Sequence, residues 1–133
     1  MPRGIEPDLR AFFAAQPDGI VAAYLFGSVA RETAGARSDV DVAVLYAVTP
    51  PATLEGLPLD LESEISRLVG RPAQVIVLNT APVDLVHRVL RDGVLLLDRD
   101  PGARIRFEVR ARNAFFDLQP IRDRYRRRPL SAS

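Results

Sequence analysis

Hydrophobic and polar positions change period along the chain, and this predicts strands and helices in alternation. Residues 20–26 are apolar or aromatic at every position, as expected of a strand buried on both faces of a sheet. Residues 40–48 predict the next strand, in which Asp41 lies on one face and its immediate neighbours on the other. Pro50 and Pro51 end this strand, because proline cannot donate a hydrogen bond to a ladder.

The rest of the chain carries further elements of both kinds. Helical spacing of apolar residues, proline near helix starts and glycine after helix ends mark their bounds. The predicted elements are a helix over 8–15, a helical turn or two over 28–33, a helix over 58–69, a strand over 73–78, a helix over 83–91, a strand over 94–97, and a last helix from 100 to 116 or as far as 128. Strands that alternate with helices predict an α/β (α+β) layer fold.

Composition limits the classes of protein that remain. The chain has 133 residues, the size of one domain, and its formal net charge of +1 favours neither nucleic acid nor a membrane as a partner. All 18 basic residues are arginine and cysteine is absent, which excludes a lysine nucleophile, disulfides and thiolate metal sites. We find neither a signal peptide nor an apolar run of roughly 20 residues, so we expect a cytoplasmic protein.

The most informative motif joins the first two strands. Gly27 and Ser28 follow the first strand directly, and Asp39 and Asp41 open the second. Strand side chains alternate between faces, so the two carboxylates are expected to point the same way. On the simplest alternative, Gly27 only permits a tight turn and Asp39 only caps a loop.

This pattern suits the chemistry of a nucleoside triphosphate. Magnesium prefers oxygen ligands and needs only one or two carboxylates besides the substrate phosphates, a role that Asp39 and Asp41 can fill. Backbone N–H groups freed at Gly27 and Ser28, together with the Ser28 hydroxyl, can bind phosphate oxygens. Arg31 is placed to reach the same phosphates.

The same residues resemble a known signature. Gly27-Ser28, ten intervening residues and Asp39-Val40-Asp41 resemble the motif of DNA polymerase beta-like nucleotidyltransferases. The small size of the chain and the sequence of residues 25–31 are similar to those of the minimal nucleotidyltransferase (MNT) branch. Members of this branch pair with HEPN-domain ribonucleases as toxin–antitoxin systems. Residues 107–120 are similar to the tail of such MNT proteins. The resemblance covers most of the chain.

The resemblance implies a fold and an activity. It implies a small mixed sheet flanked by helices, with one nucleotidyltransferase domain over 1–133, a core over about 8–98 and a C-terminal helix over about 100–128. It further implies that Mg²⁺ binds at Asp39 and Asp41 and that AMP passes from ATP to a tyrosine of the HEPN toxin, which neutralises the toxin. Besides this partner we consider a homo-oligomer, and we expect no membrane and no direct nucleic-acid contact.

One position departs from the family pattern. Gln74 stands where the family supplies a third carboxylate, and an amide neither accepts a proton nor neutralises a cation. An acid from elsewhere, namely Glu62, Glu64 or Asp84, is an alternative source. The chain is therefore either a transferase or a catalytically weakened or inactive nucleotide-binding antitoxin that acts by direct contact. Transfer to a small molecule such as an aminoglycoside is a third hypothesis, against which the short chain argues.

Three other features have simple structural interpretations. We interpret His87, the only histidine, as a half-buried packing residue rather than a catalytic one. The basic run over 122–128 suits a helix C-terminus, although it could also contact RNA or an acidic partner. Phe107, Phe115, Phe116 and Tyr125 are expected to form the packing stripe of the last helix, and any exposed part of it would suit a partner.

Overall fold

The computed structural model describes residues 4–16, 19–27, 39–50 and 56–127, with the backbone alone described for 56–59 and 118–127. The elements alternate along the chain as the sequence predicts. In order they are α1 (Ile5–Ala14), β1 (Ile20–Phe26), β2 (Val40–Tyr46), α3 (Gly56–Val69), β3 (Ala73–Val77), α4 (Val83–Asp92), β4 (Val94–Asp98) and α5 (Pro101–Arg127). No helix in these described ranges is long and apolar enough to cross a membrane.

The four strands form one mixed sheet in the order β3-β2-β1-β4. β1 pairs antiparallel with both β2 and β4, whereas β2 and β3 are parallel and are joined through α3. Every residue of β1 is buried, which confirms the interpretation of its continuous apolar run. The mixed sheet with flanking helices confirms the predicted fold class.

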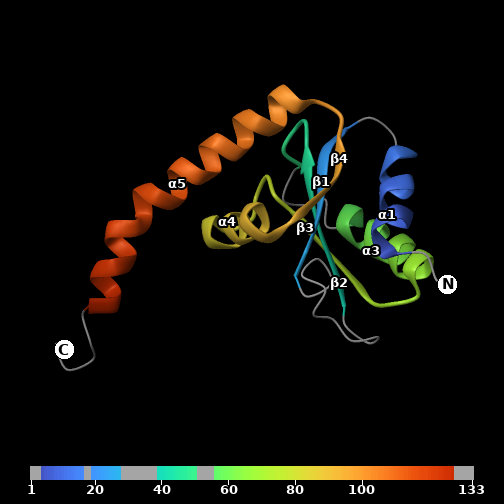
Figure 1. Ribbon diagram of the computed structural model, residues 1–133, viewed down its shortest axis with the longest axis horizontal. Coiled ribbons are helices and arrows are strands. Elements are labelled where there is room, and N and C mark those ends of the chain that lie inside the picture. Colours follow the sequence, from blue (N-terminus) through green and yellow to red (C-terminus); the bar gives the residue numbers. More distant parts are fainter. Residues whose placement is uncertain (1–3, 17–18, 28–38, 51–55, 128–133) are drawn as a thin grey trace.

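Helices cover both faces of this sheet (Figure 1). α1 and α3 lie on one face, where Phe13 and Ile65 pack against the β2 side chains Val42 and Val44. α4 and the first half of α5 lie on the other, where Val86 and the partly buried Phe107 pack against a second cluster. The side chains of β2 divide between these two clusters, so Asp41 shares a face with Ala43 and Leu45.

α5 is fixed to the sheet near its start and then extends away from it (Figure 1). The hydroxyl of the buried Tyr24 donates to Oε2 of Glu108 over 2.7 Å. Arg104 donates to both Asp98, 2.9 Å away, and Glu108, 3.1 Å away. This network joins β1, β4 and α5. The far end of the helix lies beyond α4.

Several element bounds differ from the sequence prediction. α1 begins at Ile5 rather than Asp8, because Glu6 and Pro7 are both tolerated in a first helical turn. β2 ends at Tyr46 rather than Val48, because the Asn79 side chain hydrogen-bonds both the N–H and the C=O of Tyr46, each over 2.9 Å. α5 extends to Arg127, the longer of the two predicted ends. The predicted helical turn over 28–33 lies outside the described residues.

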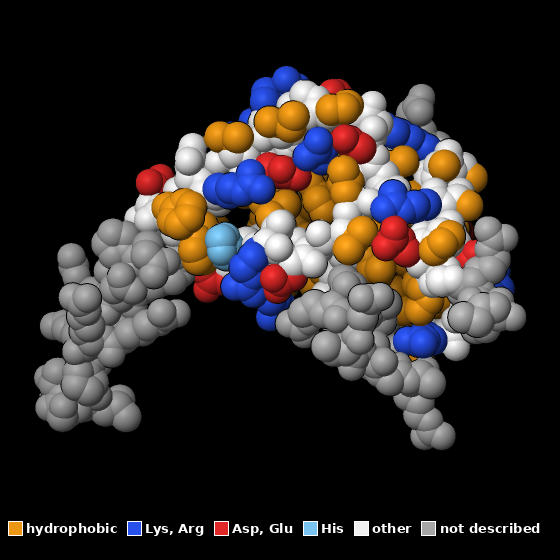
Figure 2. Space-filling model, viewed as in Figure 1, with side chains coloured by type: hydrophobic (Ala, Val, Ile, Leu, Met, Phe, Trp, Pro, Cys, Tyr) orange, Lys and Arg blue, Asp and Glu red, His pale blue; other side chains and the backbone are white. Residues whose placement is uncertain are grey.

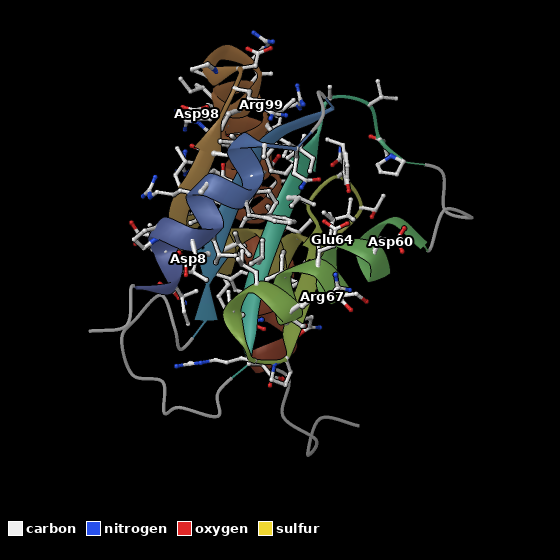
Figure 3. All side chains as sticks on the ribbon, turned by 90° about the vertical axis from the view of Figure 1, so that its right-hand side faces the viewer. Asp8, Asp60, Glu64, Arg67, Asp98 and Arg99 are labelled. Atoms are coloured by element: carbon white, nitrogen blue, oxygen red, sulfur yellow. The ribbon has the colours of Figure 1, made fainter. Side chains whose placement is uncertain are left out.

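Arg99 connects the end of the sheet to the first helix. Its guanidinium donates to the carbonyl oxygens of Phe13 and Ala14, both 3.2 Å away, and to that of Gln16. Figure 3 shows Arg99 beside the end of α1. The last carbonyl groups of a helix have no partner within it, so this arginine satisfies them.

Candidate active site

The strongest observation at the motif is the contact between Gly27 and Asp41. Phe26 pairs with Asp41 across β1 and β2, and Gly27 follows with φ 78°. A Cβ atom at position 27 would collide with Oδ2 of Asp41 and lie 3.3 Å from its Cγ. The backbone conformation and the space therefore both require glycine, and the Asp41 carboxylate lies against the bend that follows β1.

Asp39 and Asp41 act on each other electrostatically. Asp39 is exposed just before β2, and Asp41 is partly buried as its second residue. Burial raises the pKa of Asp41 above its usual value of 3.8, and the negative charge of Asp39 raises it further. Two carboxylates that disfavour each other's charge in this way are suited to a cation, because a cation relieves the repulsion.

These two acids fit a hard divalent ion that also binds phosphate. Mg²⁺ is usually held by one or two carboxylates together with substrate phosphate oxygens and water. In the described part of the chain, no group of three or more His, Cys, Asp or Glu side chains is placed to hold a metal ion. The acidic side chains that the structure describes at this motif are therefore the pair Asp39 and Asp41, and their role as metal ligands stays a prediction.

Gln74 lies beside this pair. Its Cα atom pairs with that of Asp41 in the parallel register between β2 and β3, so both side chains project from the same face of the sheet. The Gln74 side chain is exposed. An amide at this place can donate to or accept from a phosphate or a water, but it cannot take up a proton.

The structure does not bring any of the alternative acids to this position. Glu62 is engaged elsewhere, since its Oε2 accepts a hydrogen bond of 2.8 Å from the N–H of Val75. Glu64 lies on the outer side of α3, as Figure 3 shows. Asp84 belongs to the first turn of α4, which begins at the opposite end of β3 from Gln74.

Two predicted phosphate ligands, Ser28 and Arg31, lie outside the described residues, and their roles stay predictions. A further cation was missed by the sequence analysis: the positive charge of Arg88, on α4, lowers the pKa of Asp41 and partly offsets burial and Asp39. No local pattern marks Arg88, because its proximity to Asp41 depends on how α4 crosses the sheet.

His87 packs instead of facing the carboxylates. Its ring stacks on Phe115 with centroids 3.6 Å apart and planes within 3°, and Phe116 lies edge-on to it at 6.3 Å. Its Nδ1 is buried and has no hydrogen-bond partner among the described atoms. The half-buried packing role is thus confirmed, as is that of Phe107 and Phe115 on α5, whereas Phe116 is 60% exposed. Side chains of the basic run and of Tyr125 lie outside the described part.

Several solved structures share this fold. A chain of a toxin–antitoxin structure with AMP-PNP aligns with a TM-score of 0.77 and 22% identity, over 90% of this chain and 94% of that one. A chain of the MntA–HepT toxin–antitoxin aligns at 0.71 and 21%, over 91% and 92%. A chain of the tri-AMPylated Shewanella oneidensis HEPN toxin in complex with its MNT antitoxin aligns at 0.72 and 19%, over 91% and 94%.

Sequence comparison gives the family. No curated protein matches the chain. The family model described as polymerase beta, nucleotidyltransferase matches residues 8–102, which include every element from β1 to β4 and both aspartates of the motif. The chain therefore belongs to the polymerase beta nucleotidyltransferase family.

Proposed function

We propose that this chain is an MNT-type antitoxin that transfers AMP from ATP to a tyrosine of a HEPN ribonuclease toxin and thereby neutralises it. The observation that carries the proposal is the contact of the Asp41 carboxylate with the Gly27 bend. In this proposal the Asp41 carboxylate is an oxygen ligand for a cation, and the backbone at Gly27 beside it binds phosphate. Membership of the nucleotidyltransferase family supplies the class of reaction.

In this proposal Asp39 and Asp41 hold Mg²⁺, and Gly27, Ser28 and Arg31 bind the triphosphate. The ion would supply charge neutralisation at the phosphates and at the leaving group. Asp41 has a raised pKa through burial and the charge of Asp39. A proton and a cation therefore compete for the Asp41 carboxylate, and we expect Mg²⁺ binding to weaken as the pH falls.

The transfer step replaces the phosphoanhydride bond between the α- and β-phosphates of ATP by a phosphoester bond to the tyrosine oxygen. The tyrosine oxygen attacks the α-phosphorus, the bond from that phosphorus to the bridging oxygen breaks, and pyrophosphate leaves with the electron pair. The tyrosine hydroxyl loses its proton, which Gln74 cannot accept. The proton therefore passes to water or to a carboxylate of the pair, since Glu62 is engaged with the β3 backbone.

The nature of the partner rests on the solved structures with the same fold. One of them is a complex of an MNT antitoxin with a HEPN toxin that carries three AMP groups, and another contains AMP-PNP. The alignments cover 94% of each of these two chains. The proposal places the reaction in the cytoplasm, together with its ATP.

A second candidate function follows from Gln74. Its register position beside Asp41 puts an amide where the family resemblance expects an acid. Loss of a general base or a metal ligand can reduce a rate by orders of magnitude. On this alternative the chain is a nucleotide-binding antitoxin that neutralises its partner by direct contact.

The deciding experiment combines the purified chain with a HEPN-domain protein of the same organism, Mg²⁺ and ATP labelled at either the α- or the γ-phosphate. We expect the α-label alone to appear on a tyrosine of the partner, and Asp39→Asn/Asp41→Asn to abolish it. A matched control is Asp60→Asn/Glu64→Gln, which removes two exposed charges from α3 (Figure 3).

Ribonuclease activity is measured in the same samples. Absence of label under conditions where the two proteins bind would overturn AMP transfer. If the double asparagine variant still suppresses the ribonuclease, the contact mechanism is correct. If it binds the partner without suppressing the ribonuclease, the contact mechanism fails.

A further inference from the structure

A groove of about 500 Å³ lies on the same face of the sheet as Asp41 but at the opposite end of the strands. Its floor is apolar and includes Leu45 at the end of β2, Leu78 after β3, Val86 of α4 and Phe107 of α5. Figure 2 shows hydrophobic side chains between α4 and α5 on one face of the molecule, and arginines beside acidic side chains along α5. The volume is in the range of natural ligand sites.

The charged side chains that line the groove are positive. Arg106 and Arg110 line it from successive turns of α5, and none of the described residues that line it is acidic. Their neighbours Arg104 and Arg112 are paired with Glu108, whereas no described acid forms an ion pair with Arg106 or Arg110. The groove thus combines an apolar floor with two exposed guanidinium groups, which complement an apolar body that carries carboxylates.

An exposed apolar side chain lies at the edge of the groove. Val48, which lies in sequence between the lining residues Ala47 and Thr49, is 81% exposed. A small anion in the groove would leave this side chain in water, whereas a polypeptide could cover it.

We propose that this groove is the docking site for an acidic, amphipathic segment of the protein partner. An apolar side chain of that segment enters the groove, and its flanking carboxylates pair with Arg106 and Arg110. The inference rests on the proposed function, because it takes the HEPN protein as the partner. It adds a recognition surface that is separate from the nucleotide site.

The distance between the two surfaces suits one partner that contacts both. Asp41 and Leu45 project from the same face of β2 and are four residues apart, or about 13 Å along a strand. A domain that docks in the groove can therefore present a tyrosine at the Asp41 end of the sheet. The docked segment would hold the partner in position while AMP is transferred to its tyrosine.

Binding of the full chain to the HEPN-domain protein that it modifies in the experiment above, measured by calorimetry, tests the inference. Arg106→Glu/Arg110→Glu is expected to raise the dissociation constant at least about tenfold, and to weaken its dependence on salt. Ala47→Trp, which places a large side chain at the exposed groove edge, is expected to weaken binding without a change of charge. Both variants should bind Mg²⁺ and an ATP analogue like the wild type.

Arg10→Glu/Arg67→Glu is the matched control, since it changes the net charge equally on the helices of the other face. Unchanged affinity of both groove variants overturns the inference and leaves the proposed function standing. Failure of the wild-type chain to bind the partner overturns both. Self-association of the chain, lost in Arg106→Glu/Arg110→Glu, also overturns the inference, since a second copy would then be the occupant.

Discussion

The carboxylate of Asp41 lies in the space that a side chain at Gly27 would occupy. The two positions are far apart in the motif, and the antiparallel pairing of β1 with β2 brings them together. A glycine often only permits a turn. Here it also makes room for a potential metal ligand, and this dual requirement can be tested by substitution.

Gly27→Ala is expected to destabilise the fold and to displace Asp41. The positive φ alone costs about 1–2 kcal/mol for a residue with a Cβ atom. Gly70→Ala is the control, because Gly70 has a similar φ of 71° but no atom within 4 Å of its Cβ position. Denaturant unfolding should show the larger loss for Gly27→Ala, and Mg²⁺ binding should be lost only there. Equal losses and retained Mg²⁺ binding would contradict the contact.

Asp41→Asn is expected to stabilise the chain at pH 7 in buffer without Mg²⁺. The native state binds the Asp41 proton more tightly than the unfolded chain does, because burial and Asp39 raise its pKa. Stability from this group is therefore present below the usual value of 3.8 and is lost as the pH rises through the raised native pKa. The wild type and Asp41→Asn should differ more at pH 7 than at acid pH.

Urea unfolding between pH 4 and pH 8 measures this difference, with Asp60→Asn as an exposed control. Addition of Mg²⁺ should stabilise the wild type and leave Asp41→Asn unchanged, because an ion that binds only the native state adds to its stability. Parallel pH profiles for the two proteins would show that Asp41 is not perturbed.

Gln74→Glu is expected to strengthen Mg²⁺ binding and to accelerate AMP transfer by at least about tenfold, by supplying a carboxylate beside Asp41. In the absence of Mg²⁺ the added charge should raise the pKa of Asp41 further. Asn113→Asp, the same change of amide to acid on exposed α5, is the control. Single-turnover transfer and Mg²⁺ titration provide the measurements. A rate equal to that of the wild type would show that position 74 does not take part.

Tyr24→Phe is expected to lower stability by about 1.5–3 kcal/mol, the usual contribution of a hydrogen bond to a charged group. Its hydroxyl donates to Glu108 over 2.7 Å, and burial together with Glu108 raises its pKa, so it stays a donor. Thermal unfolding and hydrogen exchange in α5 should both report the loss. Tyr46→Phe, which removes a hydroxyl outside this network, should have a smaller effect.

Local pattern was sufficient for most elements of the fold and for the motif itself. The apolar run over 20–26, the glycine after it and the amphipathic helix of α4 each depend on neighbours in sequence. Arg88 and the groove could not be predicted in this way. Arg88 reaches Asp41 only because of the path of α4, and the groove requires α5 to lie across the ends of β2 and β3.

The end of β2 shows the same limit on a smaller scale. Alternation alone extended this strand to Val48, but a side chain more than thirty residues later, Asn79, bonds the backbone of Tyr46 and ends the ladder there. The Asn79 side chain takes the place of the backbone of a neighbouring strand, and the residues around Tyr46 do not indicate this.

The central place of β1 has a consequence for synthesis on the ribosome. This strand needs β4, whose first residue pairs with Leu25 and whose last pairs with Ala22, and α1 receives its final hydrogen bonds from Arg99. A nascent chain that has not yet released residues 94–99 lacks one neighbour for β1 and the cap on α1. The sheet around β1 is consequently completed only late in translation, once residues 94–99 have left the ribosome.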